Sequence, residues 1–279
     1  MPWVSELFSA PALALLRASE RRERLSAVPY FAGLMAGESE ALIRSFACEP
    51  ELHDPVRGRV KGARAFERFV VETNAWLAER NVSVDDVDLI VTDRRTVEEV
   101  VLRLDGDAGP VSLPVAIAAD REPDGRLVEL RVYFSTWPLT GSHAIRPPLL
   151  QPDPDVREAD VVGDYQRALA AGDAEAAVAT FEPDAYVREP AGDPYIHRGH
   201  DELRARYELF FSNGGGIQLE HCTATDDGRA CALEYNVVRW GRTEMPPEAG
   251  IAVYVRGTSG KLAIARIYDD SDPPLGHHE

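Results

Sequence analysis

The chain has 279 residues, 44% of them hydrophobic and 28% charged, which favours two domains of about 130 residues over one compact domain. A formal net charge of −17 argues against nucleic acid and anionic membranes as partners, because both repel an acidic surface. No apolar run approaches the roughly 18 to 20 residues of a membrane span, and no basic stretch precedes an apolar one at the start. Three cysteines without a CxxC motif predict neither disulfides nor a zinc cluster. We therefore expect a soluble protein of the reducing cytoplasm.

The first half of the chain predicts helices followed by strands. An amphipathic helix is expected over residues 4–27 and a longer helix over 63–79. Four strands are expected after it, near residues 82–92, 96–104, 111–119 and 127–134. A proline-rich stretch with little periodicity, residues 138–160, is then typical of a linker between domains.

The second half predicts the same order of elements. Helices are expected over 161–171 and 174–181, separated by Gly172, which suits a helix end, and Asp173, which suits the start of the next helix. The remaining predicted elements are a short strand at 186–189, a helix at 201–211, and strands at 217–225, 229–240, 249–256 and 261–269. Helices that precede strands favour the α+β class over alternating βαβ units.

The two halves also repeat each other in sequence, at a constant offset of 135 in the numbering. The paired positions are Tyr30 with Tyr165, Phe46 with Phe181, Asp54 with Glu189, and Arg131 with Arg266. Gly62 matches Gly199 at an offset of 137, so one loop is two residues longer in the second copy. Such a repeat indicates one structural unit built twice. We expect a first domain over residues 1–137 and a second over 161–279, each a curved, mostly antiparallel sheet wrapped around helices that encloses a tapered cavity.

One stretch of the second half carries a family pattern: VVGDYQRALAAGD at residues 161–173, followed by TFEPDAYVREPAGDP at 180–194. This resembles the ketosteroid isomerase and SnoaL-like polyketide cyclase branch of the nuclear-transport-factor-2-like superfamily. The resemblance extends from residue 161 to about 270, and more faintly from 26 to about 138. It implies two fused cone-shaped α+β domains that mimic, within one chain, the dimer many relatives form. A monomer or a homodimer of this chain is then expected.

The resemblance also implies site residues. Tyr165 falls where the isomerase has its oxyanion-stabilising tyrosine, and Glu189 where it has the aspartate that moves the proton; Tyr30 and Asp54 hold the same places in the first copy. A desolvated carboxylate can abstract a proton next to a carbonyl while a phenol donates to the enolate oxygen, so neither a metal nor an organic cofactor is needed.

The sequence departs from the family at the second oxyanion acid, which is carried by a late strand. The corresponding positions are Gly250 and Ile251 in the second copy and about Val115 and Ala116 in the first. The function implied is a cofactor-free acid/base isomerase or cyclase acting on an apolar carbonyl compound, for example a polyketide-derived one. Alternatives on the same fold are a non-catalytic small-molecule-binding or interaction protein, and an epoxide hydrolase or dehydratase, which needs a pair of acids flanked by Arg around a water.

Other interpretations of these residues stay open. The tyrosines can be core aromatics, and the acids, each before a proline, can be turn acceptors. Three further aromatic residues are predicted to bind substrate. They either line a pocket or fill it with their own side chains: Trp76, Tyr235 and Trp240. Strand alternation turns His53 away from Asp54, while His197 and His200 lack a third ligand, so no metal site is predicted.

Overall fold

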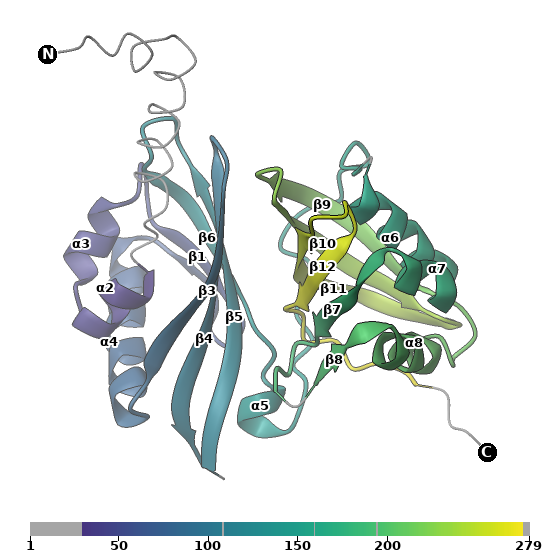
Figure 1. Ribbon diagram of the computed structural model, residues 1–279. Coiled ribbons are helices and arrows are strands. Elements are labelled where there is room, and N and C mark those ends of the chain that lie inside the picture. The colour runs from purple at the N-terminus through teal and green to yellow at the C-terminus, as the bar shows by residue number, and fades with distance from the viewer. Residues whose placement is uncertain (1–29, 108, 159, 194, 276–279) are drawn as a thin grey trace, which may run out of the picture.

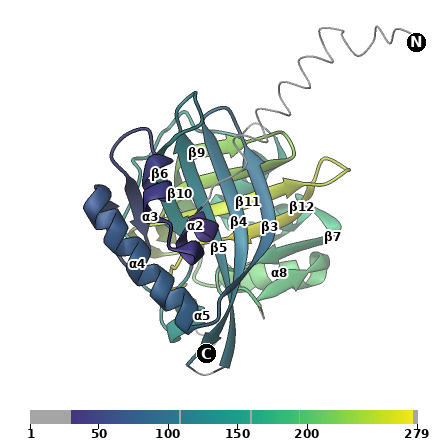
Figure 2. The same cartoon turned by 90° about the vertical axis from the view of Figure 1, so that its left-hand side faces the viewer.

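A computed structural model describes residues 30–107, 109–158, 160–193 and 195–275. It contains two six-stranded sheets that face each other in the middle of the molecule, with helices on the outer side of each sheet (Figure 1). The view turned by 90° shows the strands of the two sheets crossing behind one another (Figure 2). The predicted helix at 4–27 lies outside the described residues.

The first sheet belongs to residues 51–133 and is covered by three helices: α2 (Tyr30–Ala36), α3 (Ser39–Arg44) and α4 (Ala63–Glu79). Its strands are β1 (Glu51–Asp54), β2 (Gly58–Lys61), β3 (Ser83–Val91), β4 (Arg95–Gly106), β5 (Gly109–Arg121) and β6 (Leu127–Tyr133). They lie in the order β2-β1-β6-β5-β4-β3. Only the β1–β6 pair is parallel. A short helix, α5 (Trp137–Thr140), follows β6.

The second sheet repeats this arrangement. Its helices are α6 (Val161–Ala171), α7 (Ala174–Ala179) and α8 (Gly199–Phe210). Its strands are β7 (Phe181–Arg188), β8 (Ile196–Arg198), β9 (Ile217–Asp226), β10 (Ala230–Trp240), β11 (Thr243–Arg256) and β12 (Leu262–Ile267), in the order β8-β7-β12-β11-β10-β9. The predicted α+β class and the repeated fold are therefore confirmed.

The strand registers reproduce the offset found in the sequence. Glu99 pairs with Ala116 across β4 and β5, and Glu234 pairs with Ile251 across β10 and β11, each residue 135 positions later. The β1–β2 pair aligns with β7–β8 only at an offset of 137 for the second strand, because Leu52 faces Val60 whereas Val187 faces His197. The two additional residues therefore lie in the loop, as the sequence predicts.

Three element boundaries differ clearly from the prediction. The helix predicted to reach Phe181 ends at Ala179, and β7 starts at Phe181 rather than at residue 186. The hydroxyl of Thr180 donates to the Ala177 carbonyl, and its own carbonyl accepts from Leu262 N–H, so the chain joins the sheet at once. Similarly, β11 begins at Thr243 instead of 249, because it pairs along the whole hairpin with β10.

The two sheets meet through an apolar layer of small and β-branched side chains. The layer contains Val97, Ala116 and Ala118 from the first sheet, and Ala232 and Val253 from the second, all buried. Short side chains let two sheets approach closely and exclude water between them.

A buried ion pair crosses this layer. The Arg131 guanidinium, which is fully buried, donates from Nε to Glu234 Oε1 at 2.6 Å, and the Tyr133 hydroxyl donates to the same oxygen at 2.7 Å. Burial penalises the charge of Glu234, but Arg131 outweighs that penalty and lowers the pKa of this carboxyl to about 2.

A second ion pair occupies the equivalent positions, but here the second domain supplies the arginine and the first domain supplies the glutamate. Arg266 Nε donates to Glu99 Oε1 at 2.8 Å, and the Tyr268 hydroxyl donates to the same oxygen at 2.6 Å. Each of these residues lies 135 positions from its counterpart in the first pair. The interface is thus related to itself by a local two-fold axis, which is the geometry of a homodimer interface.

Candidate functional site

Each domain holds an open cavity between its helices and its sheet, of about 350 Å³ in the first domain and about 390 Å³ in the second. Both volumes lie in the range of small-molecule sites. The predicted residues of each half come together in the cavity of that half. The first cavity is lined among others by Tyr30, Asp54 and Trp76, and the second by Tyr165, Glu189, Tyr235 and Trp240.

Glu189 follows β7 and is held at the second cavity by two basic side chains. Its Oε1 lies 2.5 Å from His197 Nε2 on β8, and its Oε2 accepts from the Arg206 guanidinium on α8. The neighbouring Arg188 points to the other face of the sheet, where its guanidinium lies 4.7 Å from the ring centre of Tyr268. Glu189 is therefore an ion-paired carboxylate and not an isolated one.

Tyr165 presents a phenol to the same cavity from α6. The hydroxyl of Tyr207 donates to the Tyr165 hydroxyl at 3.0 Å. Burial raises the pKa of Tyr165 to about 12, so the phenol is protonated at neutral pH. With its oxygen occupied by the Tyr207 donor, Tyr165 has its own proton left to donate to an oxygen in the cavity.

Asp269, directly after β12, is a cavity residue that the sequence analysis missed. The Tyr235 hydroxyl donates to its Oδ2 at 2.8 Å. Burial, reinforced by the neighbouring acids Asp270 and Glu248, raises the pKa of Asp269 to about 6. A carboxyl with that pKa exchanges protons readily near neutral pH.

Gly250 leaves the space that Asp269 occupies. The family resemblance places the second oxyanion acid at this glycine position. Gly250 lies on β11 opposite Tyr235. A Cβ at residue 250 would come within 2.7 Å of the Tyr235 ring and 2.8 Å of Asp269 Cβ. The acid is thus supplied from the adjacent strand, in the space that the glycine leaves free.

We expect Gly250→Ala to destabilise the fold by about 1 to 3 kcal/mol, because the methyl group overpacks a closed contact. The displaced Tyr235 should also lose its hydrogen bond to Asp269. Urea unfolding measures the first effect, and the shift of the Asp269 carboxyl in a pH titration by NMR measures the second. An unchanged midpoint together with an unchanged titration would show that Gly250 is not required.

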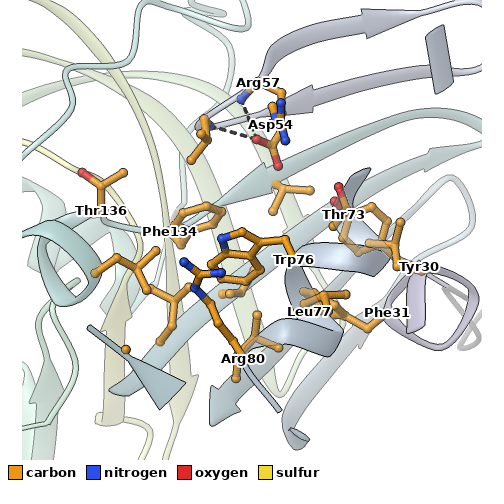
Figure 3. A pocket seen from close by; sticks show the side chains of 18 of the residues that line it. Tyr30, Phe31, Asp54, Arg57, Thr73, Trp76, Leu77, Arg80, Phe134 and Thr136 are labelled. Atoms are coloured by element: carbon orange, nitrogen blue, oxygen red, sulfur yellow. Dashed lines mark hydrogen bonds between the residues drawn. The ribbon is translucent and has the colours of Figure 1, made fainter. Parts of the chain in front are cut away.

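Among the described residues, the first cavity has no equivalent of Asp269, Tyr235 or Arg206. By the offset of 135, Asp269 corresponds to Phe134 and Tyr235 to Val100. By the offset of 137 that relates α8 to α4, Arg206 corresponds to Phe69. Asp54 remains at the edge of the cavity, where its Oδ1 accepts from the backbone N–H groups of residues 56 and 57 at 2.9 and 2.8 Å (Figure 3).

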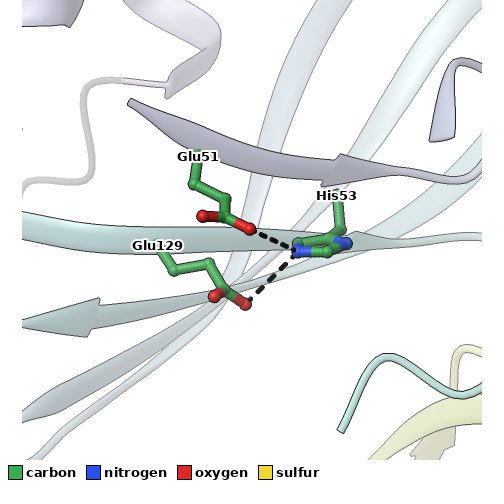
Figure 4. Close-up of side chains that lie close together, drawn as sticks. All are labelled: Glu51, His53 and Glu129. Carbon is green, nitrogen blue, oxygen red and sulfur yellow. Dashed lines mark ion pairs between the residues drawn. The ribbon is translucent and has the colours of Figure 1, made fainter. Parts of the chain in front are cut away.

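A cluster of possible metal ligands lies on the other face of the first sheet. His53 Nε2 is 3.5 Å from Glu51 Oε1 and 3.6 Å from Glu129 Oε1 (Figure 4). Glu51 already binds Lys61 Nζ at 2.7 Å and Arg59, and Glu129 binds Arg131 at 3.0 Å. These cations neutralise the carboxylates that a metal ion would need. We therefore do not assign a metal to this cluster.

The remaining histidines of the sequence analysis have separate partners. His197 binds Glu189, whereas His200 Nε2 lies 3.0 Å from the Phe181 carbonyl oxygen. They do not converge on one point.

Residues 162–263 match the SnoaL-like domain family. The second domain is therefore similar to SnoaL-like domains over most of its length. The first domain has the same strand order as the second domain. None of the curated proteins matches the chain significantly.

Solved structures similar to this chain each cover about two fifths of it. An uncharacterised cystatin-fold protein from Novosphingobium aromaticivorans is 19% identical, with a TM-score of 0.34 over 38% of this chain and 93% of that one. A hypothetical protein with a ketosteroid isomerase-like fold from Catenulispora acidiphila, in complex with trimethylamine, is 18% identical, with a TM-score of 0.34 over 39% and 85%. The epoxide hydrolase/cyclase-like enzyme SalBIII, of pyran ring formation in salinomycin, is 16% identical, with a TM-score of 0.33 over 41% and 90%.

No helix among the described residues has the length and apolar character needed to cross a membrane.

Sequence patterns could have pointed to one of the missed residues, Asp269, but not to Arg206. Successive side chains of a strand point to opposite faces. Because Arg266 and Tyr268 point toward the other domain, the residues that alternate with them, Ile267 and Asp269, point into the second cavity. Nothing in the local sequence around Arg206 indicates its partner Glu189, which lies 17 residues earlier.

Proposed function

We propose that the second cavity is the active site of a cofactor-free acid/base enzyme, an isomerase or cyclase that moves a proton on an apolar carbonyl compound. The observation that carries this proposal is Asp269, a carboxyl whose pKa is raised to about 6 by burial at the cavity wall. The protonated phenol of Tyr165 lines the same cavity. One group can therefore take a proton from carbon while the other stabilises the oxygen that becomes negative.

The proposed reaction starts with Asp269 as the carboxylate, which abstracts the proton from the carbon next to the substrate carbonyl. The electron pair moves onto the carbonyl oxygen, and Tyr165 donates a hydrogen bond to this enolate. Tyr207, which donates to Tyr165, strengthens that donor in turn. Return of the proton to another carbon completes an isomerisation. In a cyclisation the enolate carbon instead attacks a second carbonyl of the substrate, and the proton goes to the alkoxide oxygen that forms there.

Glu189 is the second carboxyl of this site and has a different environment. Arg206 compensates its charge, and His197 shares a hydrogen bond of 2.5 Å with it. We assign to this pair a role in returning the proton to the substrate, because Glu189 lines the same cavity as Asp269. Two carboxyls in two environments are thus able to play two roles in one cavity.

The experiment is hydrogen exchange at the carbon next to a ketone, followed by NMR in D₂O with 2-decalone as the apolar probe. Tyr165→Phe should slow the exchange by about 10² to 10³, the usual effect of removing an oxyanion donor. Tyr207→Phe should slow it by less than about tenfold, since Tyr165 keeps its own proton. Equal rates in the wild type, both variants and buffer alone would contradict the proposal.

Epoxide hydrolysis is a second candidate for the same cavity. It requires one carboxylate that activates water and one acid that protonates the epoxide oxygen. Glu189 flanked by Arg206, together with the protonatable Asp269, supplies such a pair. Reaction in H₂¹⁸O separates the candidates, because hydrolysis places ¹⁸O in the product whereas isomerisation and cyclisation by the route above place none there.

A further inference from the structure

We propose that the first cavity is a separate, non-catalytic binding site for an uncharged apolar molecule that carries one carbonyl or hydroxyl oxygen. Its walls are mainly aromatic and aliphatic side chains from α2, α4 and the concave face of the first sheet (Figure 3). They include Phe31, Phe69, Trp76, Leu113, Val132 and Phe134. Its volume of about 350 Å³ is close to that of the second cavity. This inference does not depend on the activity of the second cavity.

The first argument is the loss of proton-transfer groups from positions that carry them in the other copy. Phe134 stands at the place of Asp269, and Phe69 at the place of Arg206, and both phenylalanines line the cavity. The carboxylate that remains, Asp54, uses Oδ1 to accept two backbone N–H groups of its own turn. The volume of the cavity is retained while its acid/base chemistry is not, which fits binding without turnover.

The second argument is that the charges at the rim balance one another and that both arginines already have partners. The lining residues include two acids and two arginines. Arg57 NH1 lies 2.9 Å from Glu72 Oε2, and the Arg80 guanidinium lies 4.7 Å from the ring centre of Trp76. The second acid, Asp107, is exposed to solvent. An anionic ligand would therefore lose its hydration without finding an unpartnered arginine, and a cation would find its one exposed acid in solvent, whereas a neutral ligand loses little hydration.

The third argument is a hydrogen-bond donor in the apolar wall. Burial, reinforced by the nearby Asp54 carboxylate, raises the pKa of Tyr30 well above 10, so its hydroxyl is protonated. Figure 3 shows the hydroxyls of Tyr30 and Thr73 on the same side of the cavity. They can position one oxygen of a ligand, and a carbonyl or hydroxyl is the neutral group that suits them.

The test uses 6-propionyl-2-dimethylaminonaphthalene, a neutral naphthyl ketone whose emission moves to shorter wavelength in apolar surroundings. Leu102 and Val237 occupy equivalent positions in the two cavities, related by the same offset of 135. Substitution of each by Phe fills one cavity at a time. The Val237→Phe protein should retain one binding site for the probe, and addition of Leu102→Phe should weaken that site by about tenfold or more, since a filled cavity excludes the ring.

Two further measurements make the assignment specific. In the Val237→Phe protein, Tyr30→Phe should weaken the affinity for the probe about fivefold, which is the effect of losing one neutral hydrogen bond. The control Arg68→Gln changes an exposed residue of helix α4 and should leave the affinity unchanged. The anionic 1-anilinonaphthalene-8-sulfonate should not displace the probe.

If Leu102→Phe does not fold, Val132→Phe narrows the same cavity from β6. No blue-shifted emission in the Val237→Phe protein, retention of the site after the cavity is filled, or displacement by the sulfonate would overturn the proposal.

Discussion

The Asp269→Asn variant should slow proton exchange on an apolar ketone by about 10² or more, because the amide cannot accept the proton. At pH 7 the same variant should be more stable than the wild type. Asn keeps an oxygen that accepts from the Tyr235 hydroxyl, 2.8 Å from the carboxylate in the wild type. It also removes a charge that is unfavourable in the folded state.

The sign of the stability change follows from the direction of the pKa shift. Burial raises the pKa of Asp269 to about 6 in the folded protein, above the roughly 3.9 of an unfolded chain. Below about pH 4 the carboxyl is protonated in both states and costs nothing. As pH rises from 4 through 6, the wild type loses stability, by about 1 to 3 kcal/mol for a shift of about two units. The advantage of the variant should therefore appear over this window and remain constant above it.

Urea unfolding at pH 4 and pH 7.5 measures this difference. Asp270→Asn is the matched control, because the Asp270 carboxylate accepts from the Ser135 hydroxyl, from the backbone and hydroxyl of Thr136, and from Ala144 N–H. We expect that variant to be destabilised at pH 7.5. Equal stability of wild type and Asp269→Asn at both pH values would show that Asp269 is not a strained buried acid.

Removal of one partner of a buried interdomain ion pair should cause the largest loss of stability. We expect Glu234→Leu to cost about 3 to 5 kcal/mol, because it leaves the fully buried Arg131 without its bidentate partner. Asp120 and Glu129 still contact Arg131, at 2.7 and 3.0 Å, which places the loss toward the lower value. Glu99→Leu should behave in the same way through Arg266.

The double variant Arg131→Met/Glu234→Leu should cost less than Glu234→Leu alone. Replacing both partners by apolar groups of similar size leaves no unpaired charge at the sheet interface. Urea unfolding of the two single variants and the double variant measures this coupling. A double variant that is less stable than Glu234→Leu alone would contradict the explanation.

Acid should weaken the same interface. Arg131 lowers the pKa of Glu234 to about 2, below the roughly 4.3 of an unfolded glutamate. Its contribution to stability is therefore complete above about pH 4.3 and is lost as pH falls from there toward 2.

The duplicated fold could be predicted from the sequence because local sequence patterns determine it. The constant offset between Tyr30 and Tyr165 and between Arg131 and Arg266, together with helices that precede strands, was enough to predict two copies of one α+β domain. Strand registers that differ by the same offset confirm this prediction. The catalytic roles that the sequence assigns to Tyr165 and Glu189 stay predictions, and the Tyr165→Phe variant tests the first of them. For Tyr30 and Asp54, we propose binding in place of the predicted catalysis, because the first cavity has Phe134 where the second has Asp269.

Only the tertiary structure revealed how these groups are partnered. Asp269 reaches the cavity because Gly250 on the neighbouring strand leaves space beside Tyr235. This space exists only in the observed register of β10, β11 and β12. Likewise, Glu189 acquires Arg206 because helix α8 packs against β7. Sequence periodicity determines which face a side chain takes, since that is a property of one strand or helix. Burial, and with it the pKa of a carboxyl, is determined by side chains that arrive from elsewhere in the chain.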